Sequence, residues 1–282
     1  MSKEKITIWI LMDNKEIDAY KEWIVVNKRC LELISDISEF FHKKSKWQGE
    51  RKDKVLHAIL MRHTMTLTSV ALLVKCSVLQ RRATFYKLPI GLLLRNCYMD
   101  GLLGLYFCSL DEANVEEVAN CLNLDYVKAL FEEFEVYRDK IPSKFGWDDE
   151  FVEHMYTLVL EDTFLSDFSV NKSPDKIVPG KERELWKVRP KEDVRTLIPE
   201  KDVKQELNVK TIYLYLANNE TYSSCANNLY AYYKYFSQYE HFSENGFGDA
   251  IAAYNEDNIN MEAAILRISD SVKLMMEKVS EK

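Results

Sequence analysis

One segment constrains the fold of this 282-residue chain more than any other, namely residues 88–110, where apolar side chains dominate. Within it, Leu92–Phe107 reads LLLRNCYMDGLLGLYF, and eleven of these sixteen residues are apolar when Cys and Tyr are counted. The length would allow a membrane span. However, Arg95 and Asp100 lie near the middle, and each charge costs about 2.5–3.5 kcal/mol at a bilayer centre. We therefore expect a buried central helix in a soluble protein with no membrane partner.

The scarcity of glycine and proline favours an all-α fold. The chain has 8 Gly and 6 Pro, whereas all-β folds use both residues freely in turns. Apolar residues in the other long segments recur three, four or seven positions apart, which is typical of amphipathic helices. No segment alternates convincingly as a strand. The sequence therefore predicts a single domain, residues 1–282, built as a bundle of about eight or nine helices.

The predicted helices end where periodicity is lost or where a capping residue begins the next one. They cover 15–43, 54–81, 88–110, 111–122, 125–141, 149–165, 203–218, 221–243 and 260–282. Asp111, Asp125 and Thr221 are the expected N-caps of three of them, because their side-chain oxygens can accept a backbone hydrogen bond. Four of the six prolines fall in 166–204, which also lacks apolar periodicity. This segment is expected to be a long loop or excursion inside the domain.

The charge and cysteine patterns limit the choice of partner and compartment. The formal net charge is −7, whereas a protein that binds nucleic acid mainly through its phosphates is normally basic. Two stretches, His42–Lys54 and Lys172–Lys204, are locally basic, and we interpret both as solvated connections. The six Cys lie far apart with no C-x-x-C pair, which fits a reduced, cytoplasmic compartment. Nucleic acid is the less expected partner, although the sequence leaves it open.

The polar residues inside the apolar helix need partners. Asn96 and Asp100 are four apart, so they share a helix face, while Arg95 lies about 140° around the helix from Asp100. A buried unpaired guanidinium is too costly to persist. The apolar stripe of the predicted helix 221–243 continues to Glu240, where a core residue is due. We therefore expect Arg95 to be buried and paired with Glu240.

Further polar groups near Glu240 extend this into a candidate site. Ser237 and His241 share a neighbouring helix face, and tyrosines crowd the same helix. The candidate residues are Arg95, Asn96, Asp100, Ser237, Glu240 and His241. Two interpretations stay open: a buried polar network that fixes helix register, or a pocket between helices that faces a ligand. A single arginine beside tyrosines suits a small anionic or nucleotide-like molecule.

The two motifs that carry these residues resemble a known group. LLLRNCYMDGLL, followed late in the chain by YKYFSQYEHF, is similar to a group of uncharacterised bacterial helical proteins. These carry an Arg and an acidic residue on a central apolar helix, and a Ser/Tyr-x-x-x-His near the end of a later helix. In this sequence the corresponding residues are Arg95, Asp100, Ser237 and His241. The resemblance implies a bacterial all-helical protein, but it brings no established activity.

A second resemblance supports an alternative function. The helical ribonucleases and toxins called HEPN carry an Arg followed, after four to six residues, by a His. RKDKVLH, from Arg51 to His57, fits that spacing, which also arises often by chance. Lys52 stands where that family usually has a small polar or acidic residue. The alternative hypothesis is therefore a HEPN-like ribonuclease that acts on RNA through Arg51 and His57.

Familiar catalytic and metal motifs do not occur in the sequence. A di-iron bundle needs two Glu-x-x-His units, and only Glu39–His42 has that spacing. H-E-x-x-H, G-x-x-x-x-G-K-[ST] and G-x-S-x-G are absent. We expect no metal and no cofactor. The favoured hypothesis is a binding or interaction protein in a stress or defence system, whose partner is a protein or a small anionic ligand.

Overall fold

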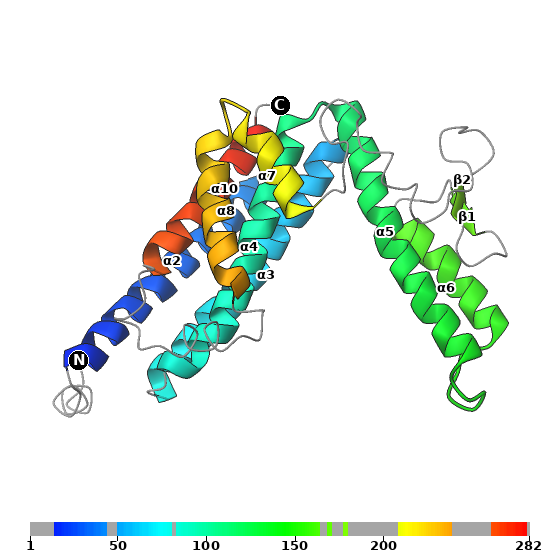
Figure 1. Cartoon of the computed structure of the whole chain (residues 1–282), viewed down its shortest axis with the longest axis horizontal. Coiled ribbons are helices and arrows are strands. Elements are labelled where there is room, and N and C mark those ends of the chain that lie inside the picture. The colour runs from blue at the N-terminus through cyan, green and yellow to red at the C-terminus, as the bar shows by residue number, and fades with distance from the viewer. Residues whose placement is uncertain are drawn as a thin grey trace. The chain divides into compact units, whose positions relative to one another are not determined.

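The computed structural model describes residues 14–43, 50–80, 83–163, 168–170, 177–179, 208–238 and 261–280. Nearly all of these residues are helical (Figure 1), which confirms the predicted all-α class. The helices are α2 (Asn14–Lys43), α3 (Arg51–Gln80), α4 (Ala83–Ser109), α5 (Glu112–Asp139), α6 (Asp149–Asp162), α7 (Val209–Ala217), α8 (Ser223–Ser237) and α10 (Met261–Ser280). The only strands in the described ranges are β1 (Phe168–Val170) and β2 (Ile177–Pro179).

The chain forms two compact units, residues 1–110 with 212–282, and residues 111–211. The single domain expected from the sequence stays a prediction. In the first unit α4 packs against α3, α8 and α10, and α2 packs against α3 and α10 (Figure 1). The predicted central helix is therefore central, and Ile90, Leu94, Leu102 and Leu105 are fully buried along it.

Helix α4 begins five residues before the predicted start at Leu88, so that Pro89 lies inside it. Pro89 has no N–H to donate, which removes one backbone hydrogen bond near the first turns. By length and composition α3, not α4, is the one helix among the described residues that could cross a membrane. Its most apolar window has a mean hydropathy of 1.2 and is 39% buried.

The predicted break between 122 and 125 is wrong, because α5 runs unbroken from Glu112 to Asp139. Asp111 caps it as expected, with its carboxylate accepting from the N–H of Asn114 at 2.9 Å. No Gly or Pro interrupts the segment, so the i to i−4 hydrogen bonds continue through it. Asn123, a potential cap, donates its side-chain N–H to the carbonyl of Thr163 at 2.7 Å.

Three further differences concern helix starts and strands. The predicted cap Thr221 is wrong, since α8 begins at Ser223 and its N-cap residue Tyr222 makes no side-chain capping bond. The described part of the predicted helix 203–218 is α7, whose first turn is capped by the carboxamide of Asn208 accepting from the N–H of Thr211. A two-stranded antiparallel hairpin, β1–β2, lies in the predicted excursion. Three-residue strands are too short to show the alternation that reveals a strand in a sequence.

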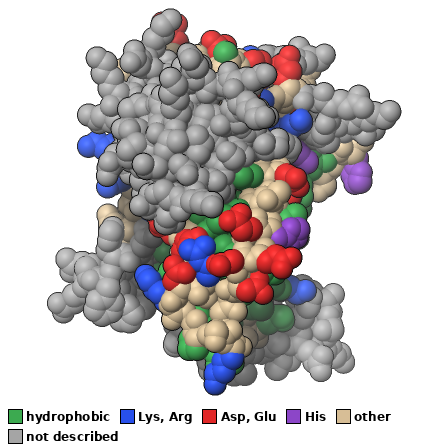
Figure 2. All heavy atoms as spheres, turned by 90° about the vertical axis from the view of Figure 1, so that its right-hand side faces the viewer, with side chains coloured by type: hydrophobic (Ala, Val, Ile, Leu, Met, Phe, Trp, Pro, Cys, Tyr) green, Lys and Arg blue, Asp and Glu red, His purple; other side chains and the backbone are tan. Residues whose placement is uncertain are grey.

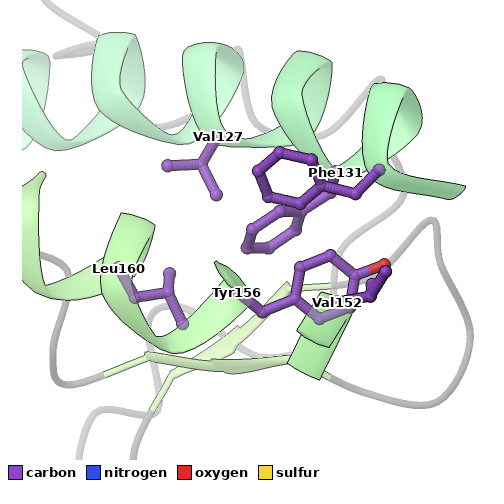
Figure 3. Packing of buried hydrophobic residues seen from close by; sticks show 6 residues of the cluster. Val127, Phe131, Val152, Tyr156 and Leu160 are labelled. Carbon is purple, nitrogen blue, oxygen red and sulfur yellow. The ribbon is translucent and has the colours of Figure 1, made fainter. Parts of the chain in front are cut away.

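The second unit is built on an α5–α6 hairpin with an aromatic core. Val127 and Phe131 of α5 point toward Val152, Tyr156 and Leu160 of α6 (Figure 3). The ring centroids of Phe131 and Tyr156 are 4.3 Å apart. These residues recur at helical spacing on both helices, so that each helix buries one face against the other.

The turn before α6 depends on one aspartate and one glycine. Asp148 caps α6, with its carboxylate accepting from the N–H of Phe151 at 2.8 Å. A Cβ on Gly146 would lie 2.5 Å from the carbonyl oxygen of Tyr137. No side chain fits against that backbone, so the close return of the chain requires glycine at this position.

Two glycines let other helices approach α4 closely. A Cβ on Gly101 would lie 3.0 Å from Oγ of Ser271 on α10 and 3.2 Å from Leu229 on α8. A Cβ on Gly104 would lie 2.1 Å from Sδ of the fully buried Met275 on α10. Glycine in a helix interior is about 1 kcal/mol less favourable than alanine. Close packing of α10 therefore explains why α4 carries glycine at these two positions.

Gly104→Ala is expected to lower the free energy of unfolding by about 1–3 kcal/mol, the usual cost of overpacking a core. The added methyl group would displace Met275, and this loss outweighs the better helix propensity of alanine. Urea denaturation of Gly104→Ala, Met275→Ala and the double variant checks the contact. The double variant should lose less than the sum of the two single losses, and strict additivity would show that the two residues do not meet.

Candidate functional site

Arg95 of α4 and Ser237 of α8, both predicted site residues, are in direct contact. Nε of Arg95 donates to Oγ of Ser237 at 3.1 Å. The Arg95 guanidinium lies over the ring of Tyr233, 5.2 Å from its centroid, and Nη2 makes a long contact of 3.5 Å with the Tyr233 hydroxyl. The site thus joins two segments 142 positions apart in the sequence.

Arg95 is half-buried rather than buried as predicted. Its guanidinium lies over the ring of Tyr233, which is itself half-buried. Planar guanidinium groups stack on aromatic faces in this way, and the stack restricts their orientation. The predicted partner Glu240, and also His241, lie outside the described residues, so the Arg95–Glu240 pair stays a prediction.

Three tyrosines extend the site away from Arg95, and we call them the tyrosine row: Tyr233, Tyr230 and Tyr213. The Tyr233 and Tyr230 centroids are 6.1 Å apart. Tyr230 then stacks on Tyr213 of α7 at 4.0 Å with the ring planes 3° from parallel. All three rings are half-buried. Burial, followed by the neighbouring Tyr233 and Tyr213, raises the pKa of Tyr230, which keeps this hydroxyl neutral.

The helical repeat explains why α8 presents this row. Tyr230, Tyr233 and Ser237 are three and four positions apart, so they share one face of the helix. Another face carries the predicted apolar stripe, with Leu229 and Phe236 buried in the core. There the ring of Phe236 stacks on that of Tyr98 from α4, with the centroids 5.8 Å apart. One side of α8 therefore anchors the helix, and the adjacent side carries the polar aromatic groups.

Asp100 does not join Arg95, because it faces a different helix. Its buried carboxylate lies 3.1 Å from Nη2 of Arg62 on α3, although none of the described groups donates a hydrogen bond to that oxygen. Burial raises the pKa of Asp100 to about 6, and the nearby Arg62 opposes this rise. Asn96 is half-buried and makes no hydrogen bond to Asp100 within the described part of the chain. The six candidate residues are thus not one cluster.

A buried histidine, His63 of α3, was missed in the sequence analysis. Its side chain is fully buried, and its Nδ1–H donates to the carbonyl oxygen of Ile59 at 2.9 Å. Burial lowers the pKa of His63 to about 4, with a smaller contribution from Arg62 in the same direction. A signal was present, since His63 lies four positions after Ile59 and four before Leu67 on the buried stripe of α3. That position predicts a neutral core histidine.

The alternative nuclease residues are not brought together. Arg51 and His57 both lie in α3, where six residues correspond to a rotation that leaves their side chains about 120° apart. The His57 ring packs edge-on against Phe41 of α2, with the centroids 4.6 Å apart. Partial burial lowers the pKa of His57. Across the described residues, no three His, Cys, Asp or Glu side chains gather to hold a metal ion.

Comparison with known proteins adds no family to this description. No family model, no curated protein and no solved structure matches the chain. The resemblance to bacterial helical proteins and the HEPN-like alternative therefore stay predictions.

Proposed function

We propose that this protein is a binding protein that holds a small anionic, nucleotide-like molecule at the junction of α4 and α8. The observation that carries the proposal is the Arg95 guanidinium, which is hydrogen-bonded to Ser237 and lies over the ring of Tyr233. A guanidinium held in this way has lost much of its rotational freedom before any ligand arrives. Less entropy is therefore lost on binding, which favours affinity for a planar anion such as a phosphate or carboxylate.

The tyrosine row provides a second recognition element, which would contact the planar ring of the ligand. Aromatic rings stack with nucleobases through their faces, and each such contact contributes about 1–3 kcal/mol. Tyr233 lies next to the positive charge, and Tyr230 follows it on the same face of α8. An anion contacting Arg95 would therefore place an attached planar ring beside these tyrosines. This combination favours a nucleotide over free phosphate or a neutral nucleoside.

The test is calorimetric titration of the full chain with AMP, adenosine and inorganic phosphate. AMP is expected to bind more tightly than either fragment. Arg95→Ala should weaken AMP binding by about 10- to 100-fold, since a hydrogen bond to a charged group contributes about 1.5–3 kcal/mol. Tyr233→Leu should weaken AMP and adenosine alike, whereas Tyr233→Phe keeps the ring and should bind adenosine almost as the wild type does.

Arg267→Ala is the matched control, because Arg267 is an exposed arginine on α10 paired with Asp270 at 3.3 Å. It should leave AMP binding unchanged. Absence of AMP binding by the wild type would contradict the proposal. So would equal AMP affinity in Arg95→Ala and the wild type. If Arg95→Ala binds normally but melts at a lower temperature, the Arg95 cluster serves to fix helix register instead.

A further inference from the structure

An apolar stripe runs along the outer face of α3. It consists of Met61, Met65, Leu72 and Leu79, which are all exposed, with Leu72 at 60% and Leu79 at 72%. Their spacings of four, seven and seven place them within about 40° of one another around the helix. The stripe extends over about 27 Å at 1.5 Å per residue. Exposed apolar side chains aligned in this way on one helix face mark an interaction surface.

The stripe has the narrow shape that another helix covers. Seven-residue spacing of apolar side chains is the pattern of a helix–helix seam. Thr68 and Ser69, both exposed, lie between the apolar positions. Helices that lie on membranes instead have a broad apolar face with Trp or Phe and a polar face rich in Lys and Arg. The composition of α3 therefore favours a helical protein partner.

The charged residues around the stripe are all basic. Residues 54–99 contain seven Lys and Arg and not one Asp or Glu. The exposed side chains of Arg62 and Lys75 lie on either side of the stripe. Two α3 helices facing each other would bring these positive groups together, so a partner with acidic side chains around apolar ones is favoured instead.

The α5–α6 hairpin carries the complementary surface. Residues 111–163 contain fifteen Asp and Glu against four Lys and Arg. Figure 2 shows a group of acidic side chains, with a few basic ones among them and hydrophobic groups nearby. On α6, Phe151 and Leu158 are exposed and seven apart, which matches Leu72 and Leu79 on α3. Glu150 and Glu161, both exposed, lie along one side of that pair.

We propose that α3 of one copy binds α6 of a second copy. Leu72 and Leu79 pack against Phe151 and Leu158 of the other chain, and the basic flanks of α3 meet the acidic flanks of α6. The two surfaces are different, so a copy that uses only one of them keeps the other free, and the assembly continues into rings or open chains. Where both surfaces of two copies meet reciprocally, the contact closes as a two-fold dimer.

Sedimentation of the full chain over a range of concentrations tests the assembly. The wild-type mass should rise with concentration at low salt and fall toward the monomer at high salt, since salt screens charge pairs at the surface. Leu72→Glu on α3 should weaken association by about tenfold or more, and so should Glu150→Lys with Glu161→Lys on α6. Leu266→Glu, an equally drastic change at an exposed position of α10, is the control and should assemble as the wild type does.

Mixing the two defective variants gives the sharpest outcome. At a concentration where each variant alone is monomeric, one still has an intact α3 surface and the other an intact α6 surface. Together they should form a dimer that contains one of each and grows no further. Circular dichroism confirms that each variant is folded.

A wild type that stays monomeric, or a mixture that stays monomeric, would overturn the proposal. Self-association of the α6 variant like the wild type would show α3 pairing with α3. A monomer that binds anionic lipid vesicles through Leu72 would assign the stripe to a membrane.

Discussion

Tyr98→Ala is expected to lower the free energy of unfolding by about 3–5 kcal/mol, the usual loss when a large buried aromatic side chain is removed. Tyr98 is fully buried at the centre of the first unit. Its ring stacks on Tyr232 and Phe236 of α8, at centroid distances of 5.4 Å and 5.8 Å. Its hydroxyl donates to the carbonyl oxygen of Ala264 on α10 at 2.9 Å. One side chain thus connects three helices.

Urea denaturation measures this loss, and Tyr98→Phe is the matched control. Phenylalanine keeps the ring stacked on α8 and removes only the hydrogen bond to α10, which contributes about 1 kcal/mol. Net stabilities of 5–15 kcal/mol are usual, so Tyr98→Ala removes a large share while Tyr98→Phe removes little. Equal losses in the two variants would mean that the hydroxyl, rather than ring packing, determines the stability of this region.

Two buried groups are expected to give opposite pH dependences of stability. The pKa of His63 is lowered to about 4 in the folded state, against about 6.5 when unfolded. As the pH falls from 6.5 to 4, His63 is therefore protonated in the unfolded state but not in the folded state. The free energy of unfolding decreases as a result. The pKa of Asp100 is raised to about 6, against about 3.9 when unfolded. Over nearly the same pH range Asp100 is protonated in the folded state but not in the unfolded state, so the free energy of unfolding increases.

The two effects are similar in size. One pKa unit corresponds to about 1.36 kcal/mol, so each group contributes a change of about 3 kcal/mol across its interval. In the wild type they largely cancel between pH 4 and 6. Asp100→Asn removes the stabilising contribution of Asp100. As the pH falls across the full interval, this variant should lose about 3 kcal/mol more of its free energy of unfolding than the wild type does. His63→Gln removes the loss and should make the protein less acid-sensitive by a similar amount.

Urea denaturation at pH 7.5 and pH 4.5 tests these signs, and about 2 kcal/mol of each change is expected to have developed by pH 4.5. The difference between the two pH values, taken within one variant, cancels any effect of the substitution on packing. All other titrating groups contribute equally to the three proteins. If Asp100→Asn and His63→Gln both show the wild-type difference, neither group has a shifted pKa in the folded state.

The local pattern of the sequence was sufficient for the fold class and for much of the helix order. Helical periodicity identified α2, α3, α6 and α10, because the repeat of 3.6 residues depends only on neighbours along the chain. The 140° between Arg95 and Asp100 likewise indicated that Arg95 needs a partner from another helix. The same local pattern wrongly predicts two helices in place of α5, because Asp125 is a potential cap, whereas the absence of any helix-breaking residue lets the helix continue.

Tertiary packing decided which polar side chains contact each other. Asp100 meets Arg62 rather than Asn96, and Arg95 stacks on Tyr233, because α3 and α8 pack on different sides of α4. His63 became a neutral buried group only when α3 was packed into the bundle. Periodicity specifies which face of a helix is buried, but it does not specify which helix covers that face. That depends on contacts between residues more than a hundred positions apart, such as Arg95 and Ser237. The sequence by itself thus determined the helices and their apolar faces, and the tertiary structure decided which polar groups share a site.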